Sequence, residues 1–341
     1  MAEISEPYRV GLTADCAEPD GMTIFGDVGL ERLTAAGLTW EVMPPIVGHL
    51  PNAGDLAGYD AVLSFGHLHF TRDVVSAAPQ LKHIARYGAG YDGIDLEGLA
   101  DAGVVVTNTP LAVRRPLALA ALTMVLALGH RLVENHVAAT GGRWTDRGNY
   151  RGAGVSGRTI GILGLGGVGS DVVRLVAPLG VRVIAPDRPG SREAAAALGV
   201  ELVDIDRLAA ESDYVVVTAA LTPSSYHLVG EHFLAAMKPS SYLVNVGRGS
   251  LVDQVALTAA LRAGSIAGAG LDVLEQEPPA ADEPLLHMDN VIVTPHALCW
   301  TDDFTKGVAT SVIEAIIDVA QGRRPEHVLN PRAAQGLRPK V

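Results

Sequence analysis

Three polar side chains in the C-terminal half of the sequence have the types that reversible oxidation of an alcohol requires. Arg248 stands between glycines after an apolar run, Glu277 precedes a Pro-Pro pair, and His296 follows Val293-Thr-Pro. A histidine can exchange the hydroxyl proton near neutral pH. A neighbouring carboxylate would stabilise the imidazolium and orient the ring, and a guanidinium suits a substrate carboxylate. Each residue alone is also explained by a turn, a solvated loop or a structural histidine, but together they predict a dehydrogenase site.

A glycine-rich turn in the sequence is typical of a binding site for a dinucleotide, which could carry the hydride. Gly164-Leu-Gly-Gly-Val-Gly169 follows the apolar run Thr159–Leu163 and precedes a helical pattern over Asp171–Leu179. In a dinucleotide-binding turn, Gly164 permits the tight bend, Gly166 lets the backbone approach a pyrophosphate, and Gly169 lets the helix pack closely on the strand. The pyrophosphate lies on the N–H groups at the start of that helix.

An acidic residue follows this turn at the distance that a ribose contact requires. Asp187 comes 21 positions after Gly166 (187 − 166), at the end of the next apolar run. A carboxylate there accepts hydrogen bonds from the adenosine ribose and repels a 2′-phosphate. The sequence therefore predicts NAD as the cofactor, while Arg188 and Arg192 leave NADP open as an alternative.

Short apolar runs alternate with Ala- and Leu-rich helical segments along the chain. This alternation predicts an α/β fold with parallel sheets covered on both faces, that is, doubly wound. The expected strands are Tyr8–Thr13, Thr39–Val42, Ala61–Phe65, His83–Arg86, Val104–Thr107, Thr159–Leu163, Arg182–Ala185, Tyr214–Thr218, Tyr242–Asn245, Ala267–Leu271 and Val291–Val293.

A long helical segment separates the two series of strands. We expect a helix from Pro116 to about Ala139, with Pro116 in its first turn, where a missing N–H costs little. A polar, Gly-rich connection over Thr140–Arg158 follows. The sequence thus predicts a complete domain before the nucleotide-binding one.

Composition excludes several classes of function. The net charge of −12 argues against a nucleic-acid partner and against docking on an anionic membrane. Two cysteines, Cys16 and Cys299, exclude a disulfide framework and a cysteine-based zinc site, and no metal is expected. The N-terminus shows no signal peptide, and the apolar stretch Leu117–Leu128 is shorter than the ~20 residues that span a bilayer. We expect a soluble cytoplasmic protein with a small-molecule substrate.

From about residue 55 to residue 331, the chain resembles the D-isomer-specific 2-hydroxyacid dehydrogenases. Several independent motifs carry the resemblance in the family order. They are Tyr87-Gly-Ala-Gly-Tyr-Asp-Gly-Ile-Asp95, Val105-Val-Thr-Asn-Thr-Pro110, the Gly164–Gly169 turn, Asn245-Val-Gly-Arg-Gly249, Leu271-Asp-Val and Thr294-Pro-His296.

The resemblance implies an NAD-dependent (R)-specific 2-hydroxyacid dehydrogenase with the catalytic residues Arg248, Glu277 and His296. It implies two Rossmann-like domains with a cleft between them. Residues 1–109 and 298–341 would form a smaller, discontinuous substrate domain, and residues 110–297 the NAD-binding domain. It also implies a homodimer with the helix near Pro116–His136 in its core. The implied cofactor contacts are Gly164, Gly166, Val168, Gly169, Asp187, Ala219, Val246, Arg248, Asp272 and His296.

The substrate carboxylate would lie on the backbone amides of Ala89 and Gly90 and on Arg248. Near this site the chain departs from the family pattern, with Arg114 and Arg115 in place of small polar residues and His67 in the loop after the third strand. We expect these three side chains to hold a second anionic group on the substrate. Solvation of the two arginines at a helix entrance is the alternative explanation.

Two other functions fit the same scaffold. A phosphite-type dehydrogenase would use the same fold and cofactor, and a corepressor-like protein would bind NAD without catalysis. The complete set of Arg248, Glu277 and His296 argues against the non-catalytic alternative.

Overall fold

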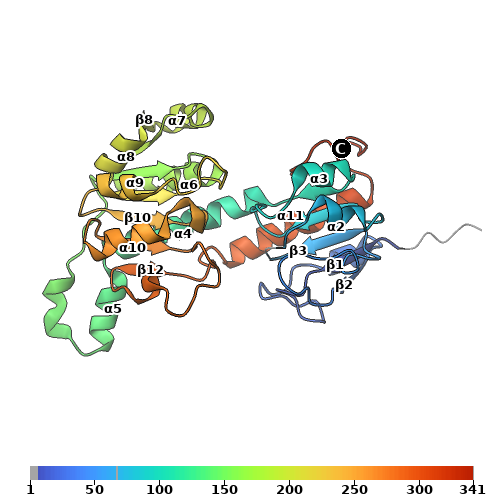
Figure 1. The fold of residues 1–341 in the computed structure, drawn as a ribbon, viewed down its shortest axis with the longest axis horizontal. Coiled ribbons are helices and arrows are strands. Elements are labelled where there is room, and N and C mark those ends of the chain that lie inside the picture. Colours follow the sequence, from blue (N-terminus) through green and yellow to red (C-terminus); the bar gives the residue numbers. More distant parts are fainter. Residues whose placement is uncertain (1–6, 67, 341) are drawn as a thin grey trace, which may run out of the picture. The chain divides into compact units, whose positions relative to one another are not determined.

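A computed structural model describes residues 7–66 and 68–340 of the chain (Figure 1). The chain divides into two compact units. Unit 1 comprises Met1–Val113 and Trp300–Val341, and unit 2 comprises Arg114–Cys299. Each unit contains one parallel β-sheet, which confirms the predicted α/β class.

Unit 1 has a five-stranded sheet in the order β2-β1-β3-β4-β5. Its strands are β1 (Arg9–Leu12), β2 (Thr39–Val42), β3 (Ala61–Ser64), β4 (His83–Arg86) and β5 (Val105–Thr107). Its helices are α1 (Glu31–Ala35), α2 (Arg72–Ser76), α3 (Leu96–Asp101) and α11 (Asp302–Ala320). Strands β1, β3, β4 and β5 are almost wholly buried, because helices cover both faces of a parallel sheet. Strand β2 lies at the sheet edge and is partly exposed.

The C-terminal tail closes on the edge of this sheet. The backbone N–H of Leu329 donates to the carbonyl of Val106 over 2.8 Å. The buried side chain of Asn330 accepts from the N–H of Val106 and donates to the carbonyl of Val104, each over 2.9 Å. Segments more than 220 residues apart in sequence therefore belong to one unit.

Unit 2 has a seven-stranded sheet in the order β12-β11-β10-β9-β6-β7-β8. Its strands are β6 (Thr159–Leu163), β7 (Arg182–Pro186), β8 (Glu201–Val203), β9 (Tyr214–Val217), β10 (Tyr242–Asn245), β11 (Gly268–Leu271) and β12 (Val291–Val293). Its helices are α5 (Leu132–Thr140), α6 (Gly167–Val176), α7 (Arg192–Leu198), α8 (Ile205–Glu211), α9 (Glu231–Ala236) and α10 (Gln254–Arg262). Helix α4 (Pro110–Gly129) begins in unit 1 and continues into unit 2. Five 3-10 turns complete the described chain: η1 (Trp144–Tyr150), η2 (Ala177–Leu179), η3 (Pro189–Ser191), η4 (Gly249–Leu251) and η5 (Pro284–His287).

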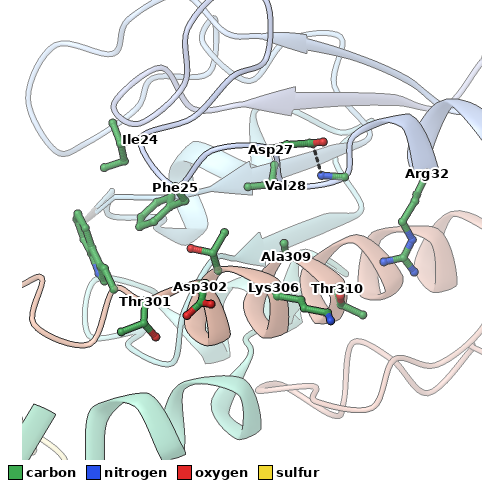
Figure 2. A pocket seen from close by; sticks show the side chains of 13 residues that line it. Ile24, Phe25, Asp27, Val28, Arg32, Thr301, Asp302, Lys306, Ala309 and Thr310 are labelled. Carbon is green, nitrogen blue, oxygen red and sulfur yellow. Dashed lines mark hydrogen bonds between the residues drawn. The ribbon is translucent and has the colours of Figure 1, made fainter. Parts of the chain in front are cut away.

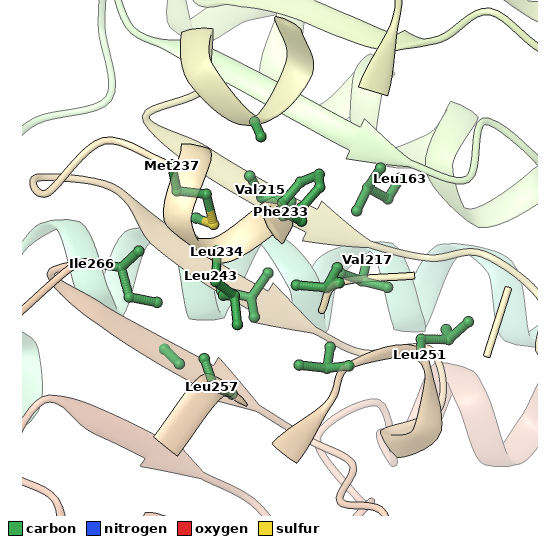
Figure 3. Packing of buried hydrophobic residues seen from close by; sticks show 14 of the residues in the cluster. Leu163, Val215, Val217, Phe233, Leu234, Met237, Leu243, Leu251, Leu257 and Ile266 are labelled. Atoms are coloured by element: carbon green, nitrogen blue, oxygen red, sulfur yellow. The ribbon is translucent and has the colours of Figure 1, made fainter. Parts of the chain in front are cut away.

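Two hydrophobic cores lie on opposite faces of this sheet. Alternate residues of a strand point to opposite faces, so Val215 and Val217 of β9 belong to one core and Val216 to the other. The first core packs the sheet against α8, α9 and α10 (Figure 3). The second packs it against α4, α6 and α7. The carboxyl ends of the strands are thereby fixed on a rigid base.

The observed strands match the expected ones to within a residue or so at each end, but β8 was not predicted. With three residues, Glu-Leu-Val, β8 is too short to show an apolar pattern in the sequence. It lies at the sheet edge beside β7. The long helix was also predicted incorrectly. It begins at Pro110, and Pro116 lies inside it. The helical segment then breaks at Arg131, whose φ of 51° is left-handed, before α5 begins.

Helix α4 has the length and composition of a membrane-spanning helix, and it is longer than the apolar stretch identified in the sequence. In the structure, 44% of its most apolar 18-residue window is buried, including Ala118, Ala121 and Met124. These residues pack against the sheet of unit 2. Core helices of water-soluble proteins pass the same test of length and composition, so the test by itself favours neither environment.

Candidate active site

Three adjacent strands of unit 2 carry the predicted catalytic segments. β10, β11 and β12 are neighbours, and the carboxyl ends of parallel strands lie at one edge of a sheet. Arg248 follows β10, Asp272 follows β11 and His296 follows β12. The sheet order therefore brings together segments that are 24 residues apart in sequence (272 − 248 and 296 − 272).

His296 and Glu277 are joined by a hydrogen bond. The Nδ1 atom of His296 lies 2.7 Å from Oε2 of Glu277. The other carboxylate oxygen, Oε1, accepts from the backbone N–H of Leu274 over 2.9 Å. The carboxylate is thus held at both oxygens, and it fixes the plane of the imidazole ring. This is the arrangement expected of an orienting acid and a proton-transferring histidine.

The backbone at His296 is strained. Its φ of 54° lies in the left-handed region, which is uncommon for a residue other than glycine. The buried carboxylate of Asp272 holds this turn, because its Oδ1 accepts from Oγ1 of Thr294 over 2.6 Å and from the N–H groups of Ala297 and Leu298 over 3.1 Å. Burial raises the pKa of Asp272 above its ordinary value. The resemblance implied a cofactor contact for Asp272, which stays a prediction, and the structure shows that Asp272 holds the loop that carries His296.

Arg248 lies in a tight turn that Asn245 stabilises. The buried side chain of Asn245 donates to the carbonyl of Arg248 over 2.9 Å and accepts from the N–H of Gly247 over 3.0 Å. At Gly249, a Cβ atom would lie 2.0 Å from the carbonyl group of Leu274. Glycine is therefore required there so that the turn with Arg248 can pack against the segment that leads to Glu277. The sequence analysis quoted Asn245 within a motif but assigned it no role.

The glycine-rich turn has the geometry of a dinucleotide cradle. Gly164 has a φ of 114°, and a Cβ atom on it would lie 2.4 Å from the N atom of Ala219. A Cβ atom on Gly169 would lie 2.2 Å from the carbonyl oxygen of Gly164. By contrast, a Cβ at Gly166 would meet no described atom within 4 Å. Gly166 is the N-cap of α6, and the N–H groups of the first turn of a helix have no partner within the helix. The residues present fit a pyrophosphate.

The remaining residues predicted to contact the cofactor lie along the same edge. Asp187 follows β7, Ala219 lies two residues beyond β9, and Val246 follows β10. Val168 is in the first turn of α6. Between the glycine-rich turn and the loops after β7 and β9 lies a cavity of about 150 Å³, lined among others by Gly164, Pro186 and Thr222.

The predicted substrate loop of unit 1 follows β4. Asn108 Nδ2 donates to the carbonyl of Ala89 over 2.8 Å, and Thr109 Oγ1 accepts from the N–H of Gly88 over 3.1 Å. Within residues 7–66 and 68–340, no hydrogen bond is formed by the backbone N–H groups of Ala89 and Gly90. Two fixed amides are therefore available to an anion. His67, the predicted third contact for a second anionic group, lies outside the described residues.

The two adjacent arginines differ in their surroundings. Arg114 Nη2 pairs with Asp171 Oδ1 of α6 over 3.1 Å, and its side chain lies against Gly167. Its Nε atom is buried and has no partner in the described part of the chain. Arg115 is exposed. The structure thus gives Arg114 a contact with the glycine-rich turn that the sequence did not predict.

Each unit contains a larger cavity among its described residues. In unit 2, a cavity of about 700 Å³ lies beside the His296–Glu277 pair and has apolar walls that include Val133 and Leu286. In unit 1, a cavity of about 600 Å³ lies between the segment around Phe25 and the first turns of α11 (Figure 2). Its wall contains two acidic and two basic side chains, so it favours no particular ligand charge. These four residues are Asp27, Asp302, Arg32 and Lys306.

Comparisons with known proteins agree with this geometry. Residues 122–297 match the family described as D-isomer specific 2-hydroxyacid dehydrogenase, NAD binding domain. The chain is 39% identical to the glyoxylate reductase of Thermococcus onnurineus over 277 residues, which are 80% of this chain and 83% of that one. The chain belongs to the D-isomer-specific 2-hydroxyacid dehydrogenases. The family assignment made from the sequence motifs is confirmed.

Two further members of the family are similar over most of this chain. The D-3-phosphoglycerate dehydrogenase of Methanocaldococcus jannaschii is 36% identical over 94% of this chain, and the chain spans 59% of its length. The solved structure of the NADPH-dependent glyoxylate/hydroxypyruvate reductase of Sinorhizobium meliloti, in complex with NADP and malonate, has a TM-score of 0.79 and 28% identity. That comparison covers 99% of this chain and 100% of the other. These relatives support NAD with NADP as an alternative, and they do not favour the phosphite-type or corepressor-like functions.

Proposed function

We propose that the protein interconverts a small 2-oxo acid and its (R)-2-hydroxy acid with a nicotinamide dinucleotide. The observation that carries this proposal is the hydrogen-bonded His296–Glu277 pair at the carboxyl edge of the sheet of unit 2. A bound nicotinamide dinucleotide supplies or accepts the hydride. We infer that unit 2 is the cofactor domain and that unit 1 is the substrate domain.

His296 is the proposed proton donor and acceptor. Because Glu277 holds Nδ1, the other ring nitrogen, Nε2, exchanges the proton with the substrate oxygen. In the reductive direction His296 gives its proton to the carbonyl oxygen, and the carboxylate of Glu277 stabilises the imidazolium before transfer. Asp272 holds the strained turn in which His296 lies, so the ring is positioned before the substrate arrives.

Arg248 and two backbone amides are the proposed substrate anchors. The guanidinium of Arg248 neutralises the substrate carboxylate and polarises the neighbouring carbonyl. The N–H groups of Ala89 and Gly90 donate to the carboxylate oxygens. Anchoring of the substrate carboxylate favours a near-attack position of the neighbouring carbon.

We further propose that the substrate carries a second anionic group. Arg115 is the exposed cation of the adjacent pair, and Arg114 pairs with Asp171 and lies against Gly167 of the glycine-rich turn. The malonate bound by the Sinorhizobium meliloti relative is a dianion, which agrees with this proposal. The contribution of His67 remains a prediction.

The protein is proposed to be a cytoplasmic homodimer. Helix α5 projects from the sheet of unit 2 (Figure 1). This helix and the turn η1 that follows it leave four large apolar side chains exposed, a pattern typical of an interaction surface. These side chains are Leu132, Val133, Val137 and Trp144. Two free cysteines, Cys16 and Cys299, agree with a reducing compartment.

A panel of 2-oxo acids tests the proposed reaction. Purified protein is mixed with NADH and each acid in turn, and the loss of NADH absorbance is followed. We expect turnover with at least one 2-oxo acid and an (R)-configured product by chiral chromatography. Binding of NADH without turnover of any acid, or turnover of phosphite instead, would contradict the proposal.

A further inference from the structure

The predicted ribose carboxylate of Asp187 already has a cationic partner in this protein. Its Oδ1 lies 2.8 Å from Nε of Arg192, and its Oδ2 accepts from Nη2 of the same guanidinium over 3.3 Å. This hydrogen bonding holds the pKa of Asp187 below its ordinary value, so the carboxylate is ionised. The pair occupies both oxygens that would otherwise repel a phosphate. A carboxylate neutralised in this way discriminates weakly against NADP.

A second arginine lies in the adjoining cavity. Arg188 lines the cavity of about 150 Å³ together with Gly164, Ser191 and Ser224. It forms no ion pair within the described ranges 7–66 and 68–340. Its backbone N–H donates to Oγ of Ser191 over 3.2 Å, and that hydroxyl donates to the carbonyl of Pro186 over 2.9 Å. The turn that follows β7 is therefore fixed by its own hydrogen bonds.

The charges at this place sum to an excess of one positive charge, from two arginines and one carboxylate. A phosphate monoester carries about −1.5 to −2 at neutral pH and pairs well with guanidinium groups. A ribose hydroxyl needs only an acceptor, which Asp187 can provide once Arg192 rotates away. The side chains of Asp187 and Arg192 are 48% and 64% exposed. Separating them therefore costs little free energy.

We infer that the protein binds both NADP(H) and NAD(H), with Arg188 as the ligand of the 2′-phosphate and Arg192 as the residue that neutralises Asp187. Arg192 is thus a specificity-determining residue that acts through the carboxylate. The inference rests on dinucleotide binding by the proposed enzyme and does not depend on the identity of its substrate.

Binding measurements without substrate test this inference. Dissociation constants of NADH and NADPH are measured by titration calorimetry for the wild type and for Arg192→Ala. In the wild type we expect the two constants to differ by less than about tenfold. In Arg192→Ala the exposed carboxylate repels the phosphate, so the constant for NADPH rises by about tenfold or more and that for NADH changes by less than about threefold. Arg207→Ala, which removes an ion-paired surface arginine from α8, is the matched control and leaves the ratio unchanged.

A double variant separates neutralisation from direct phosphate contact. If Arg192 acts through Asp187, then Asp187→Ala in the Arg192→Ala background restores NADPH binding to within about threefold of the wild type. If NADPH binding stays weak in the double variant, Arg192 binds the phosphate itself and the inference is wrong. A wild-type preference for NADH above about a hundredfold would also overturn it. Failure of the proposed function would appear differently, as normal dinucleotide binding without turnover.

Discussion

Unit 1 and unit 2 present polar groups at the carboxyl edges of their parallel sheets by different means. In unit 2 the groups are side chains with defined partners, such as the His296–Glu277 pair and the carboxylate of Asp272. In unit 1 the groups at the predicted substrate loop are backbone N–H groups, at Ala89 and Gly90. A side chain that transfers a proton restricts the residue type at its position. A backbone amide is present in every residue type except proline. The functional residues of unit 2 can therefore be predicted from the sequence more readily than those of unit 1.

Removal of the imidazole gives the largest expected effect and tests the proposed chemistry of unit 2. We expect His296→Ala to lower kcat by at least ~10²-fold, in line with the usual contribution of a general acid–base group. The dissociation constant for NADH should change little, because the cradle at Gly164–Gly169 is intact. His232→Ala is the control, since His232 is an exposed histidine of the same unit that pairs with Asp206. A near-normal kcat in His296→Ala would show that the side chains of unit 2 do not perform the proposed proton transfer.

Two alanine substitutions separate the ligand cradle of unit 2 from its packing. Gly166→Ala adds a methyl group where no described atom lies within 4 Å, so we expect an unchanged melting temperature and NADH binding weaker by about tenfold or more. Gly169→Ala places a Cβ 2.2 Å from the carbonyl oxygen of Gly164, so the fold itself should lose about 1–3 kcal/mol. Calorimetric binding and thermal unfolding measure both effects. Equal losses of stability in the two variants would show that Gly166 is structural and not part of the cradle.

A buried histidine gives unit 1 a pH-dependent stability. His83 is fully buried at the start of β4, its Nε2 lies 2.8 Å from Oγ1 of Thr107, and desolvation lowers its pKa from 6.5 to about 3. Between these values the unfolded chain binds a proton that the folded chain does not. His83 therefore contributes full stability above about pH 6.5, and that contribution is lost as the pH falls toward 3.

Urea unfolding at several pH values between 5 and 6.5 measures this effect. In the wild type, His83 should add a slope of up to about 1.4 kcal/mol per pH unit to the free energy of unfolding. In His83→Gln that part of the slope should disappear, whatever the effect of the substitution on absolute stability. Parallel pH profiles for the two proteins would show that the histidine is protonated in the folded state.

The smallest expected effect concerns the two arginines at the start of the long helix. Arg115→Ala should reduce kcat/KM for a dianionic 2-oxo acid by about two- to fivefold relative to a monoanionic one, because exposed charge pairs contribute little. Arg114→Ala should also weaken dinucleotide binding, since Arg114 packs on Gly167 and pairs with Asp171. Arg262→Ala on α10 is the control for net charge. An unchanged preference in both variants would exclude the second anionic group.

Sequence patterns alone predicted most strands, the glycine-rich turn and the three residue types of the catalytic site. Buried parallel strands and dinucleotide turns are local features, because burial, tight turns and close approaches restrict residue types over a few adjacent positions. The three-residue strand β8 and the start of α4 at Pro110 were missed. In these places tertiary packing, and not local propensity, decides where an element forms.

Only the tertiary structure decided which partner each polar group has. Asp272 bonds Thr294 and Ala297 because β11 and β12 are neighbours in the sheet. Asp187 is held by Arg192 because the turn η3 returns the start of α7 to the end of β7. The sequence determined which groups are present and on which strand ends they lie. Their partners follow from strand order and loop closure, which depend on contacts between residues far apart in the chain.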